Sequence, residues 1–360
     1  MKVVVAIDSL KGCLTSREAN QAAVAGVRQG MPGAEVVEIP VSDGGEGFLD
    51  AFQSAWGGEK VEVEVMDPLM RPVVAPYLLR GDTAIIEMAK ASGLTLLRLE
   101  ERNPMQATSY GTGQLVADAV RRGSKHVVVG LGSSATSDCG MGMIRAIIDA
   151  FAKGGTWDDV RVLDDVRFTI ATDVTNPLCG ENGAAYVFAP QKGATPEMVV
   201  SLDARAQRFA EVSAQHFGYD RQNEQGAGAA GGLGYAFLQY MKAACRSGID
   251  LLLDAVHFDE VLKDADLVIT GEGSADRQTL MGKLPFGILQ RAKAQGVPVC
   301  LIAGRIADRP ELLAAGFQHV MCINAPDLPI EEAMKPAVAR ENIMNVLQKM
   351  GEFLYDLKKK

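Results

Sequence analysis

The sequence predicts an α/β protein of two domains: a Rossmann-like, doubly wound parallel sheet made from both chain ends, plus an inserted mixed α/β domain. Strand and helix patterns alternate at both ends of the chain, whereas the middle carries strands with a half-exposed pattern. The length of 360 residues is enough for about two domains of ~100–200 residues each. We expect the doubly wound domain at residues 1–60 and 258–360 and the inserted domain at 61–257.

The N-terminal segment contains two successive strand–turn–helix units. Val3–Ile7 is a β-branched run, followed by the polar turn "DSLKGCLTS" and by a helical pattern over 16–29, for which Ser16 is the expected N-cap. The stretch 34–41 predicts a second strand, "SDGGEG" a second glycine-rich turn, and Phe48–Ala55 a helix. Such units predict a parallel sheet, which binds its ligands beyond the carboxyl ends of the strands.

The middle of the chain predicts a mixed sheet. "KVEVEVMDP" alternates like a half-exposed strand, and residues 72–89 indicate a hairpin around Gly81-Asp82. Residues 125–130 and 166–171 are apolar runs that end in polar turns, as buried strands do. These patterns predict an inserted α+β domain.

Strand and helix patterns alternate again from Asp266 onward. The order is strand "DLVITG", a helix through Gln290, strand "VPVCLIAG", a helix over 310–315, strand "HVMCIN" and a final helix over 337–357. The simplest architecture joins the two N-terminal units to these strands in one sheet and places the site in a cleft between the domains.

Composition limits the classes of partner and the compartment. The formal net charge of −9 disfavours nucleic acid and anionic membranes as partners. Asp8 interrupts the first apolar run, which is too short for a signal-peptide core or for a span of ~20 residues. The six cysteines are scattered without a metal-binding spacing. We therefore expect a cytoplasmic protein with small-molecule substrates.

A turn that combines Gly, Ser or Thr with a carboxylate follows a predicted strand five times. The polar residues of these turns are Asp8, Ser9 and Lys11; Asp43 and Glu46; Ser133, Ser134, Thr136 and Asp138; Asp173 and Asn176; and Glu272 and Asp276. Capping and turn chemistry would explain any one of them. Five together indicate Mg²⁺-dependent phosphoryl transfer, in which carboxylates hold the metal, lysine meets the phosphate and a carboxylate accepts the hydroxyl proton.

Two glycine motifs resemble dinucleotide fingerprints. "GLGSSA" at 130–135 follows a strand but lacks the acidic residue about 20 positions later, and "GAGAAG" at 226–231 lacks the preceding strand. A turn or close-packing role is the alternative for each motif. The pattern of a Walker loop is absent around Lys283, so a kinase of this sequence is not of the P-loop type. A nicotinamide-dependent oxidoreductase remains the rival enzyme class.

Nine stretches spread over almost the whole chain share the order and rough spacing of one family. They are "DSLKGCLTS", "SDGGEGFLDAF", "IEMAKASGLTLL", "RNPMQATSYGTGQL", "GLGSSATSDCGMGM", "ATDVTNPLCGENGAA", "FAPQKGATPEM", "GAGAAGGLG" and "ITGEGSADRQTLMGKLPFG". In these stretches the chain resembles the bacterial glycerate kinase type 1 family. The resemblance implies ATP-dependent phosphorylation of D-glycerate, to 2- or 3-phosphoglycerate, with Mg²⁺ and two α/β domains.

The chain also departs from that family. Ile7 stands where the family has proline, Gly12 where it has an acidic residue, "GSSAT" where it has "GGSAT", and Ser274 where it has arginine, and the connection between 151 and 167 is shorter. Losing the arginine removes a bidentate cation. Either Arg277 compensates or the acceptor is a related small hydroxy acid; a ligand-binding homologue that has lost turnover is the third alternative.

The resemblance and the turns together predict the site residues. We assign catalytic roles to Asp43, Asp173 and Lys283, with the two aspartates, interchangeable in role, flanking the acceptor hydroxyl. We assign Glu272 and Asp276 to Mg²⁺, either as ligands or as residues that hold its ligands. The alternative for Lys283 is an ion pair that holds its own turn. The substrate- or phosphate-binding set is Asp8, Ser9, Lys11, Ser133, Ser134, Thr136, Asn176, Lys192, Gly228, Gly231 and Gly232. "SSAT" and "GAGAAGG" are the candidate phosphate cradles, since glycine lets backbone N–H groups approach an anion.

Overall fold

The computed structural model describes residues 1–39, 41 and 47–358, and the chain forms two compact units. Unit 1 comprises Met1–Asp43, Ser54–Trp56 and Ile249–Lys360; unit 2 comprises Gly44–Gln53 and Gly57–Gly248. Both chain ends thus share one unit. Compared with the boundaries expected from the sequence, 44–53 and 57–60 fall in unit 2 and 249–257 fall in unit 1.

Within the described residues, unit 1 holds a five-stranded, fully parallel sheet in the order β11-β10-β9-β1-β2. Its strands are β1 (Lys2–Ile7), β2 (Glu35–Glu38), β9 (Leu267–Ala275), β10 (Val299–Ile306) and β11 (His319–Cys322). The register of β1 on β9 runs from Val3↔Leu267 to Ile7↔Gly271. This pairing confirms the predicted sheet made from both chain ends.

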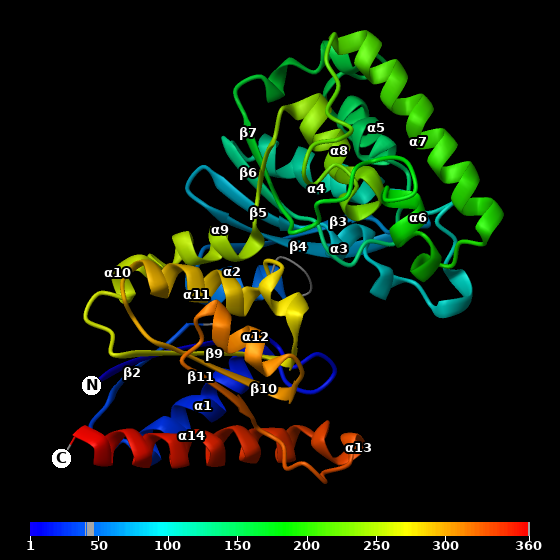
Figure 1. The fold of residues 1–360 in the computed structure, drawn as a ribbon. Helices are drawn as coiled ribbons and strands as arrows, with labels where there is room; N and C mark the ends of the chain where they lie inside the picture. The colour runs from blue at the N-terminus through cyan, green and yellow to red at the C-terminus, as the bar shows by residue number, and fades with distance from the viewer. Residues whose placement is uncertain (40, 42–46, 359–360) are drawn as a thin grey trace. The chain divides into compact units, whose positions relative to one another are not determined.

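The strand order of unit 1 reverses between β1 and β9. From β1 the chain moves outward to β2, whereas from β9 it moves in the other direction to β10 and β11 (Figure 1). The backbone N–H of Asp8 donates to the carbonyl oxygen of Gly271 at 2.9 Å, directly beyond the last β1–β9 pair. Such a reversal is where open α/β sheets bind their ligands, at the carboxyl ends of the strands.

The helices of unit 1 cover both faces of this sheet. They are α1 (Ser16–Gly30), α9 (Gly248–Ala255), α10 (Phe258–Val261), α11 (Leu284–Ala294), α12 (Arg309–Ala315), α13 (Ile330–Ala333) and α14 (Pro336–Lys358), with a 3₁₀ turn η6 (Arg277–Leu280) after β9. Alternate β1 residues such as Val3 and Val5 share a core with α1 and α14. The two helices lie side by side because Gly26 and Gly30 let the backbone of α14 approach closely (Figure 1).

The N-cap of α1 is Thr15, so the prediction that Ser16 caps this helix is wrong. Thr15 Oγ1 accepts from the backbone N–H of Glu18 at 3.2 Å, and the Glu18 carboxylate accepts from the backbone N–H of Thr15 at 2.9 Å. This reciprocal capping box needs a Glu three residues after the cap, which only Thr15 has. Ser16 instead donates its hydroxyl to the carbonyl oxygen of Ile7 at 2.6 Å and ties the helix to β1.

Unit 2 contains a mixed six-stranded sheet, counted over the described residues, in the order β3-β4-β5-β6-β7-β8. Its strands are β3 (Glu59–Met66), β4 (Pro72–Arg80), β5 (Thr83–Glu87), β6 (His126–Gly130), β7 (Arg167–Ala171) and β8 (Ala244–Arg246). The pairs from β3 to β5 are antiparallel and those from β5 to β8 are parallel. The Arg80↔Thr83 pair confirms the predicted hairpin around Gly81-Asp82.

Helices pack around this second sheet. They are α2 (Phe48–Ala55), α3 (Ala89–Ser92), α4 (Tyr110–Arg121), α5 (Met141–Phe151), α6 (Ala184–Phe188), α7 (Pro196–Phe217) and α8 (Ala229–Met241), with 3₁₀ turns η1 (Leu94–Leu96), η2 (Leu99–Glu101), η3 (Trp157–Asp159), η4 (Arg161–Leu163) and η5 (Pro190–Lys192). Tyr77, Phe168 and Phe237 belong to the core between them. In the described part of the chain, no helix is long and apolar enough to cross a membrane.

Candidate active site

In unit 1 the turn after β1 lies against the last residues of β9. β9 runs on to Ala275, beyond the predicted strand, because its pairing with β10 continues to Ile306. A Cβ built on Gly273 would lie 3.7 Å from the Cα of Leu10 and 3.8 Å from the backbone nitrogen of Lys11. The structure therefore brings the predicted Asp8–Lys11 turn to the end of β9, at the strand-order reversal.

Glu272 is the buried carboxylate of this edge. It is 8% exposed; the Thr279 hydroxyl donates to its Oε1 at 2.6 Å, and Lys283 Nζ donates to its Oε2 at 3.2 Å. Burial raises the pKa of Glu272 above its ordinary value, while the Thr279 hydrogen bond and the Lys283 charge act in the opposite direction. The ion pair is the alternative role considered for Lys283, yet the side chain of Lys283 keeps 38% of its surface exposed and can still meet a ligand.

Asp276, the second predicted metal residue, caps η6. Its Oδ1 accepts from the backbone N–H of Gln278 at 2.8 Å, and its own N–H donates to the Thr279 hydroxyl at 3.0 Å. No group of three or more His, Cys, Asp or Glu residues that could hold a metal occurs in the described ranges. Each Glu272 oxygen accepts one hydrogen bond and keeps a lone pair, so Glu272 fits a Mg²⁺ ion that takes its other oxygens from substrate phosphates and water.

Arg277, the residue considered as a substitute for arginine at position 274, points to other partners. Its guanidinium donates to Glu311 at 2.5 Å and lies 3.8 Å from Asp308. Ser274 itself is exposed. The register of the sheet instead pairs Ser274 with Arg305 on β10.

In unit 2 three predicted stretches converge at the carboxyl ends of β6 and β7. The backbone N–H of Leu131 donates to the carbonyl oxygen of Ala171 at 3.0 Å, which joins the turns after the two strands. Residues 226–232 close the group, since Gly228 N–H donates to the carbonyl oxygen of Asn176 at 2.9 Å and Cys139 N–H donates to that of Gly231 at 3.1 Å. The structure thus gathers "SSAT", "TDVTNP" and "GAGAAGG" within one unit.

The glycines of this group are needed for close packing. Gly231 has φ +66°, and a Cβ there would lie 2.0 Å from the carbonyl oxygen of Thr136; a Cβ on Gly228 would lie 2.4 Å from that of Pro177. Gly232, at φ +87°, packs against Cys139. Close packing was the alternative for "GAGAAG", and a phosphate cradle over Gly228, Gly231 and Gly232 stays a prediction.

Lys192 is a buried cation beside the "SSAT" turn. It is 2% exposed, and its ammonium donates to the Ser134 hydroxyl at 2.8 Å and to the carbonyl oxygen of Thr136 at 2.7 Å. Burial lowers the pKa of Lys192 to about 7, while the charge of Asp138 raises it. Lys192 therefore acts on the conformation of the turn, in which Ser133 has φ +53°.

Asp138 fixes the other end of the same turn. Its Oδ2 accepts from the backbone N–H and hydroxyl of Ser109 at 2.8 and 2.9 Å and from the N–H of Gly142 at 3.1 Å. The carboxylate thereby ties the turn to the first residues of α4 and α5. Close by in sequence, Thr136 Oγ1 and Ser137 Oγ are buried and make no hydrogen bond with any described residue.

Of the two predicted acid–base residues, the structure describes Asp173 but not Asp43. Asp173 follows β7 and is half-buried, and neighbouring Asn176 donates its amide to the carbonyl oxygen of Asn182 at 2.8 Å. Asp43, like Glu46, lies outside the residues that the structure describes. The assignment of Asp43 and Asp173 as catalytic residues stays a prediction.

Sequence reasoning missed Glu87, at the end of β5. This side chain is 2% exposed and accepts from the backbone N–H of Leu49 at 3.0 Å, at the start of α2, while Lys90 Nζ lies 3.4 Å from it. Burial raises the pKa of Glu87, against the charge of Lys90. Its signal in the sequence is a carboxylate directly after the buried run "TAII". The five turns show the same signal, but Glu87 is not followed directly by a glycine or serine.

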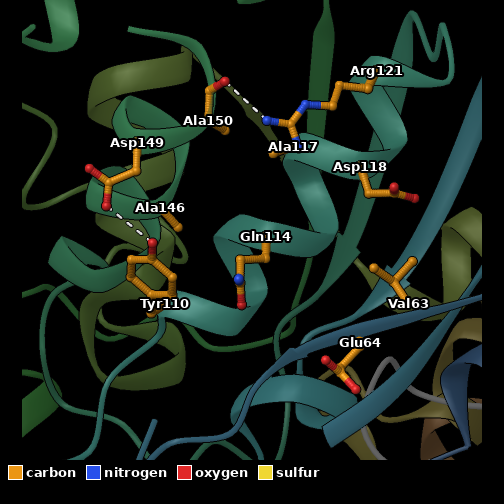
Figure 2. A pocket seen from close by; sticks show the side chains of 10 residues that line it. All are labelled: Val63, Glu64, Tyr110, Gln114, Ala117, Asp118, Arg121, Ala146, Asp149 and Ala150. Atoms are coloured by element: carbon orange, nitrogen blue, oxygen red, sulfur yellow. Dashed lines mark hydrogen bonds between the residues drawn. The ribbon is translucent and has the colours of Figure 1, made fainter. Parts of the chain in front are cut away.

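A hollow of about 250 Å³ lies elsewhere in unit 2, between α4, α5 and β3 (Figure 2). Tyr110 donates its hydroxyl to Asp149 at 3.1 Å, and Arg121 donates to the carbonyl oxygen of Ala150 at 3.0 Å. None of the predicted site residues lines it. We therefore keep the candidate site at the carboxyl ends of the strands.

The "GLGSSA" stretch does not have the geometry of a dinucleotide fingerprint. That motif requires a helix that opens within the glycine-rich turn. Here α5 begins only at Met141, after a turn in which Ser133 and Cys139 both have positive φ. The structure thus gives the oxidoreductase alternative no support.

Known proteins resemble the chain over its whole length. A model described as "Glycerate kinase family" matches residues 3–355. The chain is 40% identical to the glycerate kinase of Bacillus subtilis over 94% of each chain, and 41% identical to the glycerate 2-kinase of Escherichia coli over 86% of each. A crystal structure named for a glycerate kinase 2 of Salmonella typhimurium LT2 resembles it with a TM-score of 0.84, 38% identity and full coverage of both chains.

Proposed function

Because the chain belongs to the glycerate kinase family and is a kinase, we propose that it transfers the γ-phosphoryl group of ATP to D-glycerate with Mg²⁺. The observation that carries this proposal is the contact of the Asp8–Lys11 turn with Gly273, next to Glu272, at the strand-order reversal of unit 1. A lysine-bearing turn beside a carboxylate suits a metal-bound phosphate chain. The substrates are small molecules, and we propose that the protein acts in the cytoplasm.

We propose the 2-hydroxyl of glycerate as the acceptor. The relative from Escherichia coli, 41% identical, is named a glycerate 2-kinase. The oxygen of that hydroxyl would form a bond to the γ-phosphorus as the bond from this phosphorus to the β–γ bridging oxygen breaks. ADP leaves with the bridging oxygen, and the hydroxyl proton passes to a carboxylate.

We propose roles for the predicted residues of each unit taken by itself. In unit 1, Lys11 and Lys283 would meet phosphate oxygens, and Glu272 would hold Mg²⁺, which neutralises charge on those oxygens when bound. In unit 2, Asp173 would accept the hydroxyl proton, a role that Asp43 could fill instead. Lys192 and Asp138 would keep the "SSAT" turn in its conformation.

Two measurements test this function. ADP release in the presence of ATP, Mg²⁺ and D-glycerate, followed by a coupled assay, would support the kinase, and phosphorus NMR of the product distinguishes 2- from 3-phosphoglycerate. Steady ADP release without either product would refute glycerate as the acceptor. Tight binding of both substrates without ADP release would indicate a homologue that has lost turnover.

A related hydroxy acid is the second candidate acceptor, because exposed Ser274 replaces the arginine expected from the resemblance and Arg277 pairs with Glu311. A panel of D-glycerate, L-glycerate, glycolate and tartronate separates the two candidates. The acid with the highest kcat/KM is the substrate.

A further inference from the structure

Arg305 lies at the carboxyl end of β10, beside the end of β9. The register pairs it with Ser274, and Ala303 with Glu272. Side chains of paired residues on neighbouring strands leave the same face of a sheet, and alternate residues along a strand share that face. The Arg305 side chain therefore starts from the same face as Ser274 and Glu272, with the strands ~4.8 Å apart.

Arg305 has no partner of its own. Its side chain is exposed, and its guanidinium forms no ion pair or hydrogen bond with any residue in the described ranges. Three neighbouring cations are engaged: Lys283 pairs with Glu272, Arg277 with Glu311, and Arg309 donates to a backbone carbonyl oxygen. The five N–H donors of the Arg305 guanidinium thus have no described partner at the edge of the sheet where ligands bind.

Lys11 is the matching cation on the other side of β9. It belongs to the turn after β1, is exposed, and likewise forms no ion pair or hydrogen bond within the described part of the chain. The Lys11 turn lies against Gly273, whose Cβ direction is on the face of β9 opposite to Ser274 and Arg305. Within the described residues, each face of β9 near its carboxyl end thus has one cation without a partner, in a protein whose net charge is −9. Each cation is available to an anionic ligand on its own face of the sheet.

We propose that Arg305 binds a pair of anionic oxygens of a substrate, belonging either to the carboxylate of the acceptor acid or to the phosphates of ATP. The planar fork of a guanidinium matches both groups through two parallel hydrogen bonds, which a lysine ammonium cannot form. Ser274, which is paired with Arg305, is exposed as well and has a short side chain. The inference rests on the proposed function, since it names the residue that holds one of that reaction's substrates.

The first test is steady-state kinetics of Arg305→Gln. We expect the KM of one substrate, D-glycerate or ATP, to rise about 10- to 100-fold, the loss expected for a charged hydrogen-bonded pair. The substrate whose KM rises identifies the source of the oxygens. Arg277→Gln is the matched control: an exposed arginine near the same edge, already paired with Glu311, whose removal should leave both KM values within about twofold.

The second test moves the guanidinium from position 305 on β10 to the paired position 274 on β9. Arg305→Ser should lose affinity as Arg305→Gln does, and the double variant Ser274→Arg/Arg305→Ser should recover at least part of it, because the two positions are paired on one face. Calorimetric titration with ATP alone and with D-glycerate alone measures the same losses without turnover. A thermal melting midpoint within experimental error of the wild type shows that each variant is folded.

Unchanged KM and Kd values in folded Arg305→Gln would overturn the inference and leave Arg305 a solvated surface residue. Absence of ADP release by the wild-type protein would overturn the proposed function instead. In that case the titrations still decide whether Arg305 binds an anion, so the two failures are distinguishable.

Discussion

The ammonium of Lys192 lies 2.7 Å from the carbonyl oxygen of Thr136, and both residues are almost completely buried. A lysine in such a place normally has a carboxylate partner, yet this one donates to a neutral carbonyl and to the Ser134 hydroxyl. The folded protein therefore bears the cost of desolvating a charge in order to hold one turn. This cost appears in the pKa of Lys192, which burial lowers to about 7.

The stability of the protein should depend on pH through Lys192. In the unfolded chain a lysine keeps its proton up to ~10.4, whereas the folded pKa is about 7. Between these values the unfolded state binds more protons, so this group's contribution to stability rises with pH and is least favourable below pH 7. Urea unfolding of wild type and Lys192→Met at pH 6.5 and 9 should show the free-energy difference, wild type minus variant, rising with pH. A pH-independent difference would contradict the prediction.

Replacing Lys283 with Met should lower turnover far more than stability. Its pair with Glu272 joins a buried carboxylate to a lysine side chain that is 38% exposed; solvent screens the lysine side, so we expect the loss of the pair to cost about 1 kcal/mol. A cation that meets charge developing on the transferring phosphoryl group can contribute several kcal/mol, so we expect kcat/KM to fall ~100-fold or more. Measuring kcat/KM and the urea midpoint on the same variant separates the roles. Near-normal turnover with lost stability would make Lys283 a structural residue.

Gly231→Ala should destabilise unit 2 through a backbone clash. A left-handed conformation costs a non-glycine residue ~1–2 kcal/mol, and the new Cβ would also lie 2.0 Å from the carbonyl oxygen of Thr136. Gly218→Ala is the control, because Gly218 has φ +74° with nothing within 4 Å of a Cβ. The free energy of unfolding should fall further for Gly231→Ala than for Gly218→Ala. Equal losses would show that the turn moves aside without cost.

Removing Mg²⁺ should abolish phosphoryl transfer. Excess EDTA should reduce ADP release to the background rate, and added Mg²⁺ should restore it, because an acidic protein needs a cation to hold triphosphate oxygens. Glu272→Gln should require a higher Mg²⁺ concentration for half-maximal rate while Asp276→Asn, at a capping residue, should change it less. Full activity in EDTA would exclude the metal.

Hydrophobic periodicity predicted the elements well because both sheets bury regular patterns. The helix over Phe48–Ala55 and the hairpin at Gly81-Asp82 are confirmed. The capping box of Thr15 was readable, since Glu18 stands at the required spacing, but Ser16 offered a competing cap.

The parts of the site that could not be predicted depend on packing between segments distant in sequence. Lys192 lies in the stretch "FAPQKGATPEM", in which no pattern indicates a buried cation, and its ammonium donates to residues 134–136, more than 50 positions away. In the same way, the register of β10 on β9 places Arg305 beside Ser274, and the sequence alone does not specify that register.

The pairing of β1 with β9 has a consequence for the order of folding. The backbone N–H of Lys2 donates to the Asp266 carboxylate across 264 positions, so β1, which lies between β2 and β9, cannot complete its pairing until β9 has been made late in synthesis. Unit 2, nearly continuous from Gly57 to Gly248, needs no such wait. Contacts so distant along the chain slow folding. Pulse-labelled hydrogen exchange should therefore show amides of β6 and β7 protected before those of β1, and earlier protection of β1 would mean that the two chain ends find each other first.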